Sequence, residues 1–300
     1  MKFKIIIPTF NAGDQLEKLI VKIQKYKDDL FVIDSSSTDN TIDILNKHKI
    51  SYKVIDRNDF NHGKTRNLAG KLFDCEFLIY ITQDTMFIDS SSIEKIINVM
   101  EDDSSIAAVY GRQIPYENTN LFGKHLRKFN YKDSSYTRVI SDKVKYGIKT
   151  AFLSNSFCGY RKKCLEEIGW FKDDLILGED MYAGAKFLMS GYKLSYASDA
   201  VVYHSHSYSI VEEFKRYFDI GVFHRKENWL LKEFGKAEGE GKKYVVSEFK
   251  YILNNKKFYL IPSFFIRNFM KYLGYKLGFY YYIFPNALRR KLSMTNKYWE

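Results

Sequence analysis

The residues with the clearest chemical capacity are Thr82, Gln83 and Asp84, which follow the apolar run at residues 77–80. A short apolar run is typical of a buried strand, and open α/β sheets bind ligands at the carboxyl ends of their strands. A carboxylate in that place could hold a metal ion against a phosphate group. Asp84 is therefore our first candidate for a metal ligand.

Polar side chains also follow the other strands predicted in the first half of the chain. Thr9 and Asn11 come after the first strand, Asp34 after the second, and Gln83 with Asp84 after the fourth. Because the carboxyl ends of parallel strands share one edge of a sheet, we expect these residues to converge on a ligand site. The same residue types form turns and cap helices, so that simpler role stays open for individual positions.

A second candidate is the polar segment at residues 59–67, which contains His62, Gly63, Arg66 and Asn67. Gly63 would allow a ligand to approach the backbone closely. The helix predicted after it would present N-terminal amides to a phosphate, and the Arg66 guanidinium matches phosphate oxygens. An ordinary polar loop is the alternative interpretation.

The third candidate is the pair Glu179 and Asp180, which follows Gly178 at the start of a predicted helix. Carboxylates are stabilised at a helix N-terminus, and one of the two could act as a general base toward a hydroxyl group. Acidic residues also occur at helix starts without any catalytic role, and this alternative stays open.

His204 and His206 form the fourth candidate. They alternate along a predicted strand and should face opposite sides, so we expect only one of them to join Asp84. Spacing does not tell which. A carboxylate with an imidazole suits a divalent cation that keeps positions open for phosphate, whereas a purely structural histidine is the alternative.

The elements that must position these residues alternate between strand and helix through residue 110, which predicts a mostly parallel sheet with helices on both faces. Residues 111–150 show weak periodicity, and there we expect a mobile loop or a helical insertion. Further on, the pattern predicts a helix from Glu179 that ends near Gly191 and a long amphipathic helix at residues 210–222. The strands are expected at residues 4–7, 31–33, 54–55, 77–81 and 201–203, and the earlier helices at 16–23, 42–45, 65–73 and 93–100.

Composition limits the class of protein. The 300 residues are 45% hydrophobic and 28% charged, which indicates a globular chain with a large core. The net charge of +11 favours an anionic partner such as a nucleic acid, an acidic lipid or a phosphorylated substrate. Cys75, Cys158 and Cys164 lack metal-site spacing, so we interpret them as reduced thiols of a cytosolic protein. We expect no signal peptide and no transmembrane span.

The last part of the chain is basic and aromatic. A glycine-rich charged linker is predicted at residues 235–243, and residues 256–291 interleave aromatic residues with Lys and Arg. Such a composition suits helices in a membrane interface on anionic lipid, broken at Pro262 and Pro285. The alternative is a pair of helices packed on the catalytic domain. We expect a domain at residues 1–235 and a membrane-associating helical extension at 236–300.

Taken in order, the motifs PTFN, IDSSSTDNT, FNHGKTRN, TQD, GED and YHSHS resemble the inverting family 2 glycosyltransferases of the GT-A fold. The variants SSSTD, FNHGKTRN and TQD are most similar to bacterial rhamnosyltransferases. The likeness covers roughly residues 1–230. It implies a Rossmann-like α/β fold and transfer of a sugar to a lipid-linked or polysaccharide acceptor in cell-surface polysaccharide synthesis. The implied donor is a nucleotide sugar, dTDP-L-rhamnose above all, and the implied cofactor is Mg²⁺ or Mn²⁺.

The resemblance also implies a role for each matching residue. Asp84 would hold the metal on the diphosphate, helped by a histidine of the pair His204 and His206. Asp180, next to Glu179, would be the catalytic base. The donor would be bound by Thr9, Asn11, Asp34, His62, Gly63, Arg66, Asn67 and Gln83. The enzyme would lie on the inner face of the cell membrane.

Two positions depart from the family pattern. Ser35 stands where a second aspartate often follows Asp34, which puts a contact to the base in doubt. Thr82 replaces the first aspartate of the DxD motif, so the metal would have one protein carboxylate fewer. We therefore expect weak metal binding without the donor.

Other functions stay open at this stage. The same fold could use UDP-galactofuranose or UDP-glucose as its donor. A basic, aromatic nucleic-acid-binding protein would need its positive charge and stacking rings on one face, whereas the aromatic residues here concentrate late in the chain. A protein that binds sugar nucleotides without catalysis is a third possibility, and an intact Asp84 and Asp180 argue against it.

Overall fold

Four segments of the first hundred residues form parallel strands, and the third of them lies a few residues before the predicted position at 54–55. They are β1 (Phe3–Thr9), β2 (Leu30–Asp34), β3 (Ser51–Val54) and β4 (Phe77–Ile81), and they pair in the order β3-β2-β1-β4. Every residue of β2 and β4 is buried, which is typical of strands that are covered on both faces. The computed structural model describes residues 2–235 and 238–300.

Later strands extend this sheet with mixed directions. β8 (Phe157–Arg161) lies antiparallel between β4 and β6 (Ile106–Ile114), and β9 (Lys193–Tyr203) pairs in parallel with β6. Two short strands, β5 (Met86–Phe87) and β7 (Tyr136–Arg138), pair with β9 in the antiparallel sense. The antiparallel β8 brings the polar residues around residue 155 to the edge where β4 ends.

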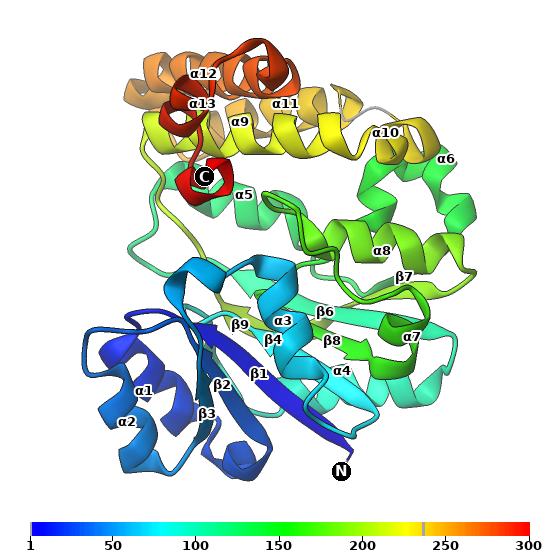
Figure 1. The fold of residues 1–300 in the computed structure, drawn as a ribbon. Helices are drawn as coiled ribbons and strands as arrows, with labels where there is room; N and C mark the ends of the chain where they lie inside the picture. Colours follow the sequence, from blue (N-terminus) through cyan, green and yellow to red (C-terminus); the bar gives the residue numbers. More distant parts are fainter. Residues whose placement is uncertain (1, 236–237) are drawn as a thin grey trace.

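Helices cover both faces of the sheet (Figure 1). Side chains alternate along β1: Ile5 and Ile7 share a core with α1 (Gly13–Lys22), α2 (Thr41–His48) and α4 (Ser92–Asp102). Ile6 belongs to the opposite core, which includes residues of α3 (His62–Gly70), α7 (Lys162–Glu167) and α8 (Glu179–Met189). Cys158 and Cys164 lie in that second core with Cys75, and all three cysteines are free.

The weakly periodic region is structured, and the helical alternative is the one found. It contains α5 (Leu121–Asn130), α6 (Lys143–Tyr146) and two short 3₁₀ segments (Ile140–Asp142 and Gly147–Ala151). Asn120 caps α5 by accepting a hydrogen bond from the Gly123 amide (2.8 Å), and Phe122 is buried. Gly191, at φ +87°, follows the end of α8 as predicted.

The second half of the chain builds a helical layer over the sheet (Figure 1). It consists of α9 (Ile210–Lys226), α10 (Asn228–Phe234), α11 (Glu238–Asn254), α12 (Ile261–Phe279) and α13 (Asn286–Leu292). Pro262 lies in the first turn of α12, and Pro285 is the N-cap of α13. The two prolines therefore separate helices, as expected.

Glycines let α9 and α12 pack backbone against backbone. A Cβ atom at Gly278 would lie 1.9 Å from the Phe218 carbonyl oxygen, and one at Gly221 would lie 2.3 Å from the Tyr275 carbonyl oxygen. These close contacts pack α12 tightly against α9. The predicted linker is wrong for residues 238–243, which are helical; Gly235 ends α10, and residues 236 and 237 lie outside the described part.

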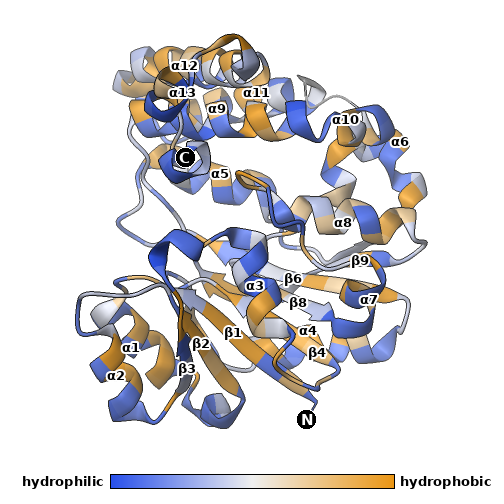
Figure 2. Cartoon of the chain, viewed as in Figure 1, coloured by the Kyte–Doolittle hydropathy of each residue, from blue (hydrophilic) through white to orange (hydrophobic). Residues whose placement is uncertain are grey.

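Apolar residues recur along the strands and along α12 (Figure 2). No helix within the two described ranges is both long enough and apolar enough to cross a membrane.

Candidate active site

A tight turn after β4 fixes the position of Asp84. The Thr85 amide donates to the Thr82 carbonyl oxygen (3.0 Å), and the Thr85 hydroxyl donates to the Ser156 carbonyl oxygen (2.9 Å). The Tyr116 hydroxyl donates to the Asp84 carbonyl oxygen (3.0 Å). These hydrogen bonds hold the turn in place and so fix the backbone from which the Asp84 carboxylate extends.

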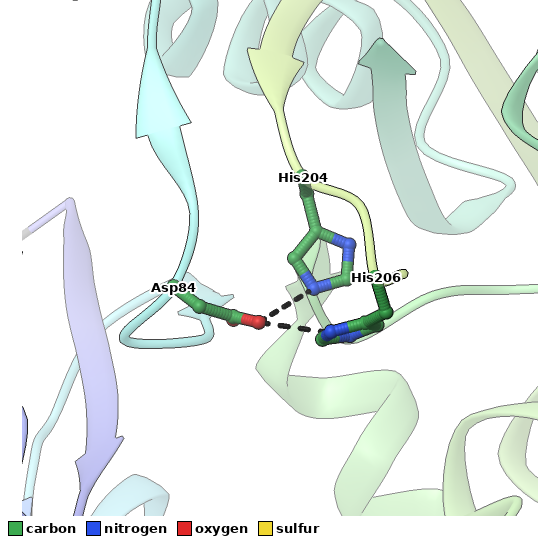
Figure 3. A group of neighbouring side chains, drawn as sticks. All are labelled: Asp84, His204 and His206. Atoms are coloured by element: carbon green, nitrogen blue, oxygen red, sulfur yellow. Dashed lines mark ion pairs between the residues drawn. The ribbon is translucent and has the colours of Figure 1, made fainter. Parts of the chain in front are cut away.

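Both histidines lie at this carboxylate, contrary to the expectation that only one could (Figure 3). The Asp84 Oδ2 atom is 3.2 Å from His204 Nε2 and 3.6 Å from His206 Nε2. The prediction was wrong because β9 ends at Tyr203, so the two-residue period of a strand does not extend to the histidines. The three side chains form a group in which one potential ligand atom from each lies within 4.8 Å of the others.

The hydrogen bonds of His204 prepare this group for a cation. Its Nδ1 atom lies 2.8 Å from the Gln113 Oε1 atom, and the Gln113 Nε2 atom donates to Ser154 Oγ (2.8 Å). A proton on Nδ1 leaves a lone pair on Nε2, which faces the Asp84 oxygen. Two lone pairs that face each other repel, and a cation between them would remove this repulsion. Hydrogen bonds like the one from His204 Nδ1 to Gln113 commonly orient the ligands of a metal ion.

Burial keeps the two imidazoles neutral. It lowers the pKa of His204 and lowers that of His206 to about 4. Two neutral imidazoles and one carboxylate are a donor set that fits a divalent first-row metal ion.

Asp180 lies at the start of α8, where Gly178 occupies the left-handed region at φ +82°. Its carboxylate accepts hydrogen bonds from the amides of Asn155 (3.2 Å) and Met181 (2.8 Å). Burial, followed by the neighbouring charge of Glu179, raises the pKa of Asp180 to about 7. A carboxylate with that pKa can accept a proton near neutral pH.

Glu179 is engaged elsewhere and is not free to act as a base. Its Oε1 atom lies 3.1 Å from Arg66 Nη1 in a buried ion pair and accepts a hydrogen bond from Asn155 Nδ2 (2.9 Å). Burial opposes its ionisation, but the charge of Arg66 and the hydrogen bonds to the carboxylate, that of Asn155 among them, together outweigh burial and lower the pKa of Glu179. The two carboxylates therefore have different roles: Glu179 is ionised and pairs with Arg66, whereas the half-buried Asp180 is the candidate base.

Two cavities meet at this place. One, of about 600 Å³, contains Asp84, both histidines, Glu179 and Asp180. The other, of about 700 Å³, contains Thr9 and Gln83. His62, Arg66 and Thr82 line both cavities. We call them the transfer cavity and the nucleoside cavity.

Arg66 is the charged residue at this junction. Its Nη1 atom also donates to the His62 carbonyl oxygen (2.8 Å), while its buried Nε atom has no hydrogen-bond partner among the described residues. A buried donor without a partner costs free energy, so a ligand with acceptor oxygens at the junction would stabilise it.

Other residues of the predicted donor site make contacts within the protein and are not free for a ligand. The Asn61 side chain accepts from the Gly63 and Lys64 amides (2.9 and 3.1 Å), so these N-terminal amides of α3 are not free for a phosphate. A Cβ atom on Gly63 would lie 2.3 Å from the Lys172 carbonyl oxygen, so the close approach there is by protein. Asn67 donates to the Phe171 carbonyl oxygen (2.7 Å) and to Asp173 (2.8 Å).

Of the residues at the strand ends, some line the nucleoside cavity and others form hydrogen bonds within the protein only. Thr9 and Gln83 line the nucleoside cavity, and Gln83 also pairs with both backbone groups of Phe10 (2.8 and 3.1 Å). Both oxygens of Asp34 accept hydrogen bonds from Ser37, and the Asn11 side chain accepts from the Thr38 amide (2.8 Å). Neither Asp34 nor Asn11 is among the residues that line the cavity.

Several residues of the site have no signal in the sequence. Gln113 and Asn155, which orient His204 and the acidic pair, are isolated polar residues. Arg57, whose guanidinium lies 4.0 Å from the centre of the Phe10 ring, belongs to the polar segment next to the predicted donor motif. The helical layer adds Tyr217, Tyr244, Lys271 and other residues to the transfer cavity.

Comparisons with known proteins identify the relatives of this chain. Two curated relatives align along almost the whole chain. The O-antigen chain rhamnosyltransferase RfbN of Salmonella typhimurium is 44% identical, over 100% of this chain and 96% of the relative. The O-antigen chain rhamnosyltransferase WbaN of Salmonella anatum is 39% identical, over 99% of this chain and 95% of the relative.

Solved structures establish the fold. A mannosyltransferase from Pyrobaculum calidifontis in complex with GDP-Man and Mn²⁺ superposes with a TM-score of 0.64 and 14% identity, over 94% of this chain and 87% of the other. Staphylococcus aureus TarS, residues 1–349, gives a TM-score of 0.56 and 17% identity over 94% and 91%. The fold is thus the GT-A fold. The model of glycosyl transferase family 2 matches residues 4–169, more than half of the chain, and the protein belongs to that family.

Proposed function

We propose that this glycosyltransferase is a metal-dependent inverting rhamnosyltransferase, which transfers L-rhamnose from dTDP-L-rhamnose to a lipid-linked saccharide during synthesis of a cell-surface polysaccharide. The observation that carries the mechanism is that Asp180 and the group of Asp84, His204 and His206 line the same cavity. The choice of sugar rests on the two relatives named as O-antigen chain rhamnosyltransferases.

The two cavities suggest how the donor lies. Its nucleoside would occupy the nucleoside cavity, beside Thr9 and Gln83. Its diphosphate would lie at the junction, between Arg66 and Asp84, and the sugar would extend toward Asp180 in the transfer cavity. The acceptor would enter the same cavity beneath the helical layer.

The residues present supply what an inverting displacement needs. Asp180 would take the proton of the acceptor hydroxyl while the oxygen of that hydroxyl attacks the anomeric carbon of the donor sugar. The bond between this carbon and the diphosphate would break at the same time, which inverts the anomeric configuration. Arg66, held by Glu179 at 3.1 Å, would stabilise the negative charge that builds on the departing diphosphate. Mg²⁺ or Mn²⁺ bound by Asp84, His204 and His206 would neutralise that charge further.

A panel of nucleotide sugars tests donor and metal together. We expect dTDP-L-rhamnose with Mn²⁺ to raise the melting temperature of the wild-type enzyme and to support transfer. Asp84→Asn should lose both effects, while Asp14→Asn, a matched change at an exposed residue of α1, should lose neither. If UDP-galactofuranose or UDP-glucose stabilises the enzyme instead, the assignment of dTDP-L-rhamnose as the donor is wrong. If a nucleotide sugar binds but no sugar is transferred, the proposal that the protein is an enzyme is refuted.

We also propose that α12 rests on an anionic membrane surface, where the lipid-linked acceptor is found. One face of α12 packs on α9, and the opposite face exposes Phe265 (61%), Phe269 (61%) and Tyr272 (62%). Exposed rings on a helix of a basic protein suit the headgroup region of a bilayer. Phe258, Tyr259, Tyr282 and Ile283 extend the apolar surface beyond both ends of the helix.

Flotation with vesicles that contain phosphatidylglycerol tests this location. The triple variant Phe265→Ser, Phe269→Ser and Tyr272→Ser should lose most of its vesicle binding. A matched control replaces exposed apolar residues of other elements, Val21, Leu72 and Val144, by serine. Equal flotation of the two triple variants would refute the membrane proposal.

A further inference from the structure

The residues that follow α13 return to the donor side of the molecule. In Figure 1 the C-terminal end of the chain lies beneath α13, on the side of the helical layer that faces the sheet. Five consecutive residues, Met294, Thr295, Asn296, Lys297 and Tyr298, line the nucleoside cavity together with Thr9, Ser35 and Gln83. We call residues 293–298 the C-terminal strap.

A buried carboxylate of α9 holds one end of the strap. Asp219, which is 1% exposed, accepts hydrogen bonds from the Ser293 hydroxyl (2.6 Å), the Met294 amide (3.0 Å), the Thr295 amide (3.1 Å) and the Thr295 hydroxyl (3.2 Å). Four donors on one buried carboxylate fix the strap to the helical layer, since breaking them would leave the charge without partners. The position of the strap is therefore determined by α9.

The other end of the strap reaches the sheet domain. The Lys297 ammonium donates to the Asn58 Oδ1 atom (3.0 Å), and the Tyr298 hydroxyl donates to the Asp174 carbonyl oxygen (3.0 Å). Asn58 follows Arg57, which stacks on the Phe10 ring in the same cavity. The strap thus crosses one side of the nucleoside cavity and connects its two protein layers.

One residue that lines the cavity, Ser35, carries a buried polar atom without a partner among the described residues. The hydroxyl of Ser35, a residue that is 2% exposed, has no hydrogen-bond partner in the described part of the chain. A buried hydroxyl of this kind costs free energy unless a ligand pairs with it. Together with the aromatic Phe10 and the guanidinium of Arg57, it suits a ligand with a flat ring and polar edges.

We propose that the C-terminal strap is part of the donor site: it forms one wall around the nucleoside of a nucleoside diphosphate, and the Ser35 hydroxyl of the same cavity is a hydrogen-bonding partner of that nucleoside. The proposal rests on the proposed function, because it assumes that the nucleoside lies in this cavity. It also gives the helical layer a role in donor binding, since Asp219 of α9 sets the position of the strap.

Binding of nucleotides in the presence of Mn²⁺ tests the strap. A chain that ends at Leu292 should bind dTDP at least tenfold more weakly than the full chain, and Lys297→Gln and Ser35→Ala should each weaken binding about threefold. Lys291→Gln, at an exposed lysine of α13, is the matched control and should bind like the wild type. Inorganic pyrophosphate should bind equally to all of these proteins, because its site would be formed by Arg66 and Asp84.

The outcomes separate this proposal from the assignment of the function. If the shortened chain and both point variants bind dTDP as the wild type does, the strap is not part of the donor site, whatever the activity. If pyrophosphate binding falls in parallel with dTDP binding, the strap acts on the fold as a whole and the proposal is likewise overturned. If the wild type prefers another nucleoside diphosphate, the same comparison is made with that nucleotide, and the donor assignment alone fails.

Discussion

The buried ion pair beside Asp180 makes Glu179→Gln the most informative single substitution. Glu179 is ionised and lies next to Asp180, whose pKa is raised to about 7 by burial and then by the charge of Glu179. Glutamine removes that charge and leaves the opposite charge of Arg66 without its partner at 3.1 Å. Both changes favour the ionised form of Asp180, so its pKa should fall.

The expected effect on catalysis follows from the direction of this change. Asp180 must be deprotonated to accept a proton, so activity rises with pH through its pKa. With a pKa of about 7, roughly a tenth of the enzyme is active at pH 6; a fall of about one pH unit, or about 1.4 kcal/mol, would make about half of it active. Relative to its own plateau, the variant should therefore be about fivefold more active than the wild type at pH 6.

The assay is the pH dependence of kcat/KM for the donor between pH 5 and 9, with each profile scaled to its own plateau. The plateau of Glu179→Gln should be lower, because Arg66 loses its buried partner. Glu117→Gln, a matched change at an exposed residue, should keep the wild-type midpoint. An unchanged midpoint in Glu179→Gln would refute the coupling between the two carboxylates.

Three further substitutions test other parts of the structure. Gln113→Leu should weaken Mn²⁺ binding about tenfold in the presence of dTDP, because His204 loses its orienting partner; unchanged affinity in a titration would contradict this. Gly278→Ala should lower the free energy of unfolding, measured in urea, by about 1–3 kcal/mol, because the added Cβ atom would clash with the Phe218 carbonyl oxygen. Gly239→Ala, whose Cβ atom would lie in open space, should leave the free energy of unfolding unchanged. The melting temperature of Asp180→Asn relative to the wild type should rise with pH from about 5 to about 7 and level off above that, because a pKa raised from 3.8 to about 7 makes the ionised aspartate cost stability over this range. A difference that stays constant from pH 5 to 7 would refute the raised pKa.

Much of the fold could be predicted because its signals are local. The short apolar runs became β1, β2 and β4, and the acidic pair lies at the start of α8 as expected. The convergence of polar residues at the carboxyl ends of the strands also follows from topology alone. Thr9, Gln83 and Asp84 line the two cavities at this edge, as the pattern suggested, whereas Asn11 and Asp34 do not.

Other features depend on contacts that the local pattern does not contain. The strand period was extended past Tyr203, where β9 ends, so the joint approach of His204 and His206 was missed. The amides of α3 were expected to bind phosphate, but Asn61 already caps them. The strap was not expected, because residues more than two hundred positions apart, such as Ser35 and Lys297, come to line one cavity only in the folded chain.

The most direct test of the central claim measures transfer and donor binding side by side in Asp180→Asn. As general bases typically contribute ~10²–10⁴-fold, we predict that kcat for rhamnose transfer falls at least a hundredfold, while the dissociation constant for dTDP-L-rhamnose with Mn²⁺ stays within about threefold of the wild-type value. The wild-type product should have the inverted anomeric configuration by NMR. Full turnover by Asp180→Asn, or retention of configuration by the wild type, would contradict the account.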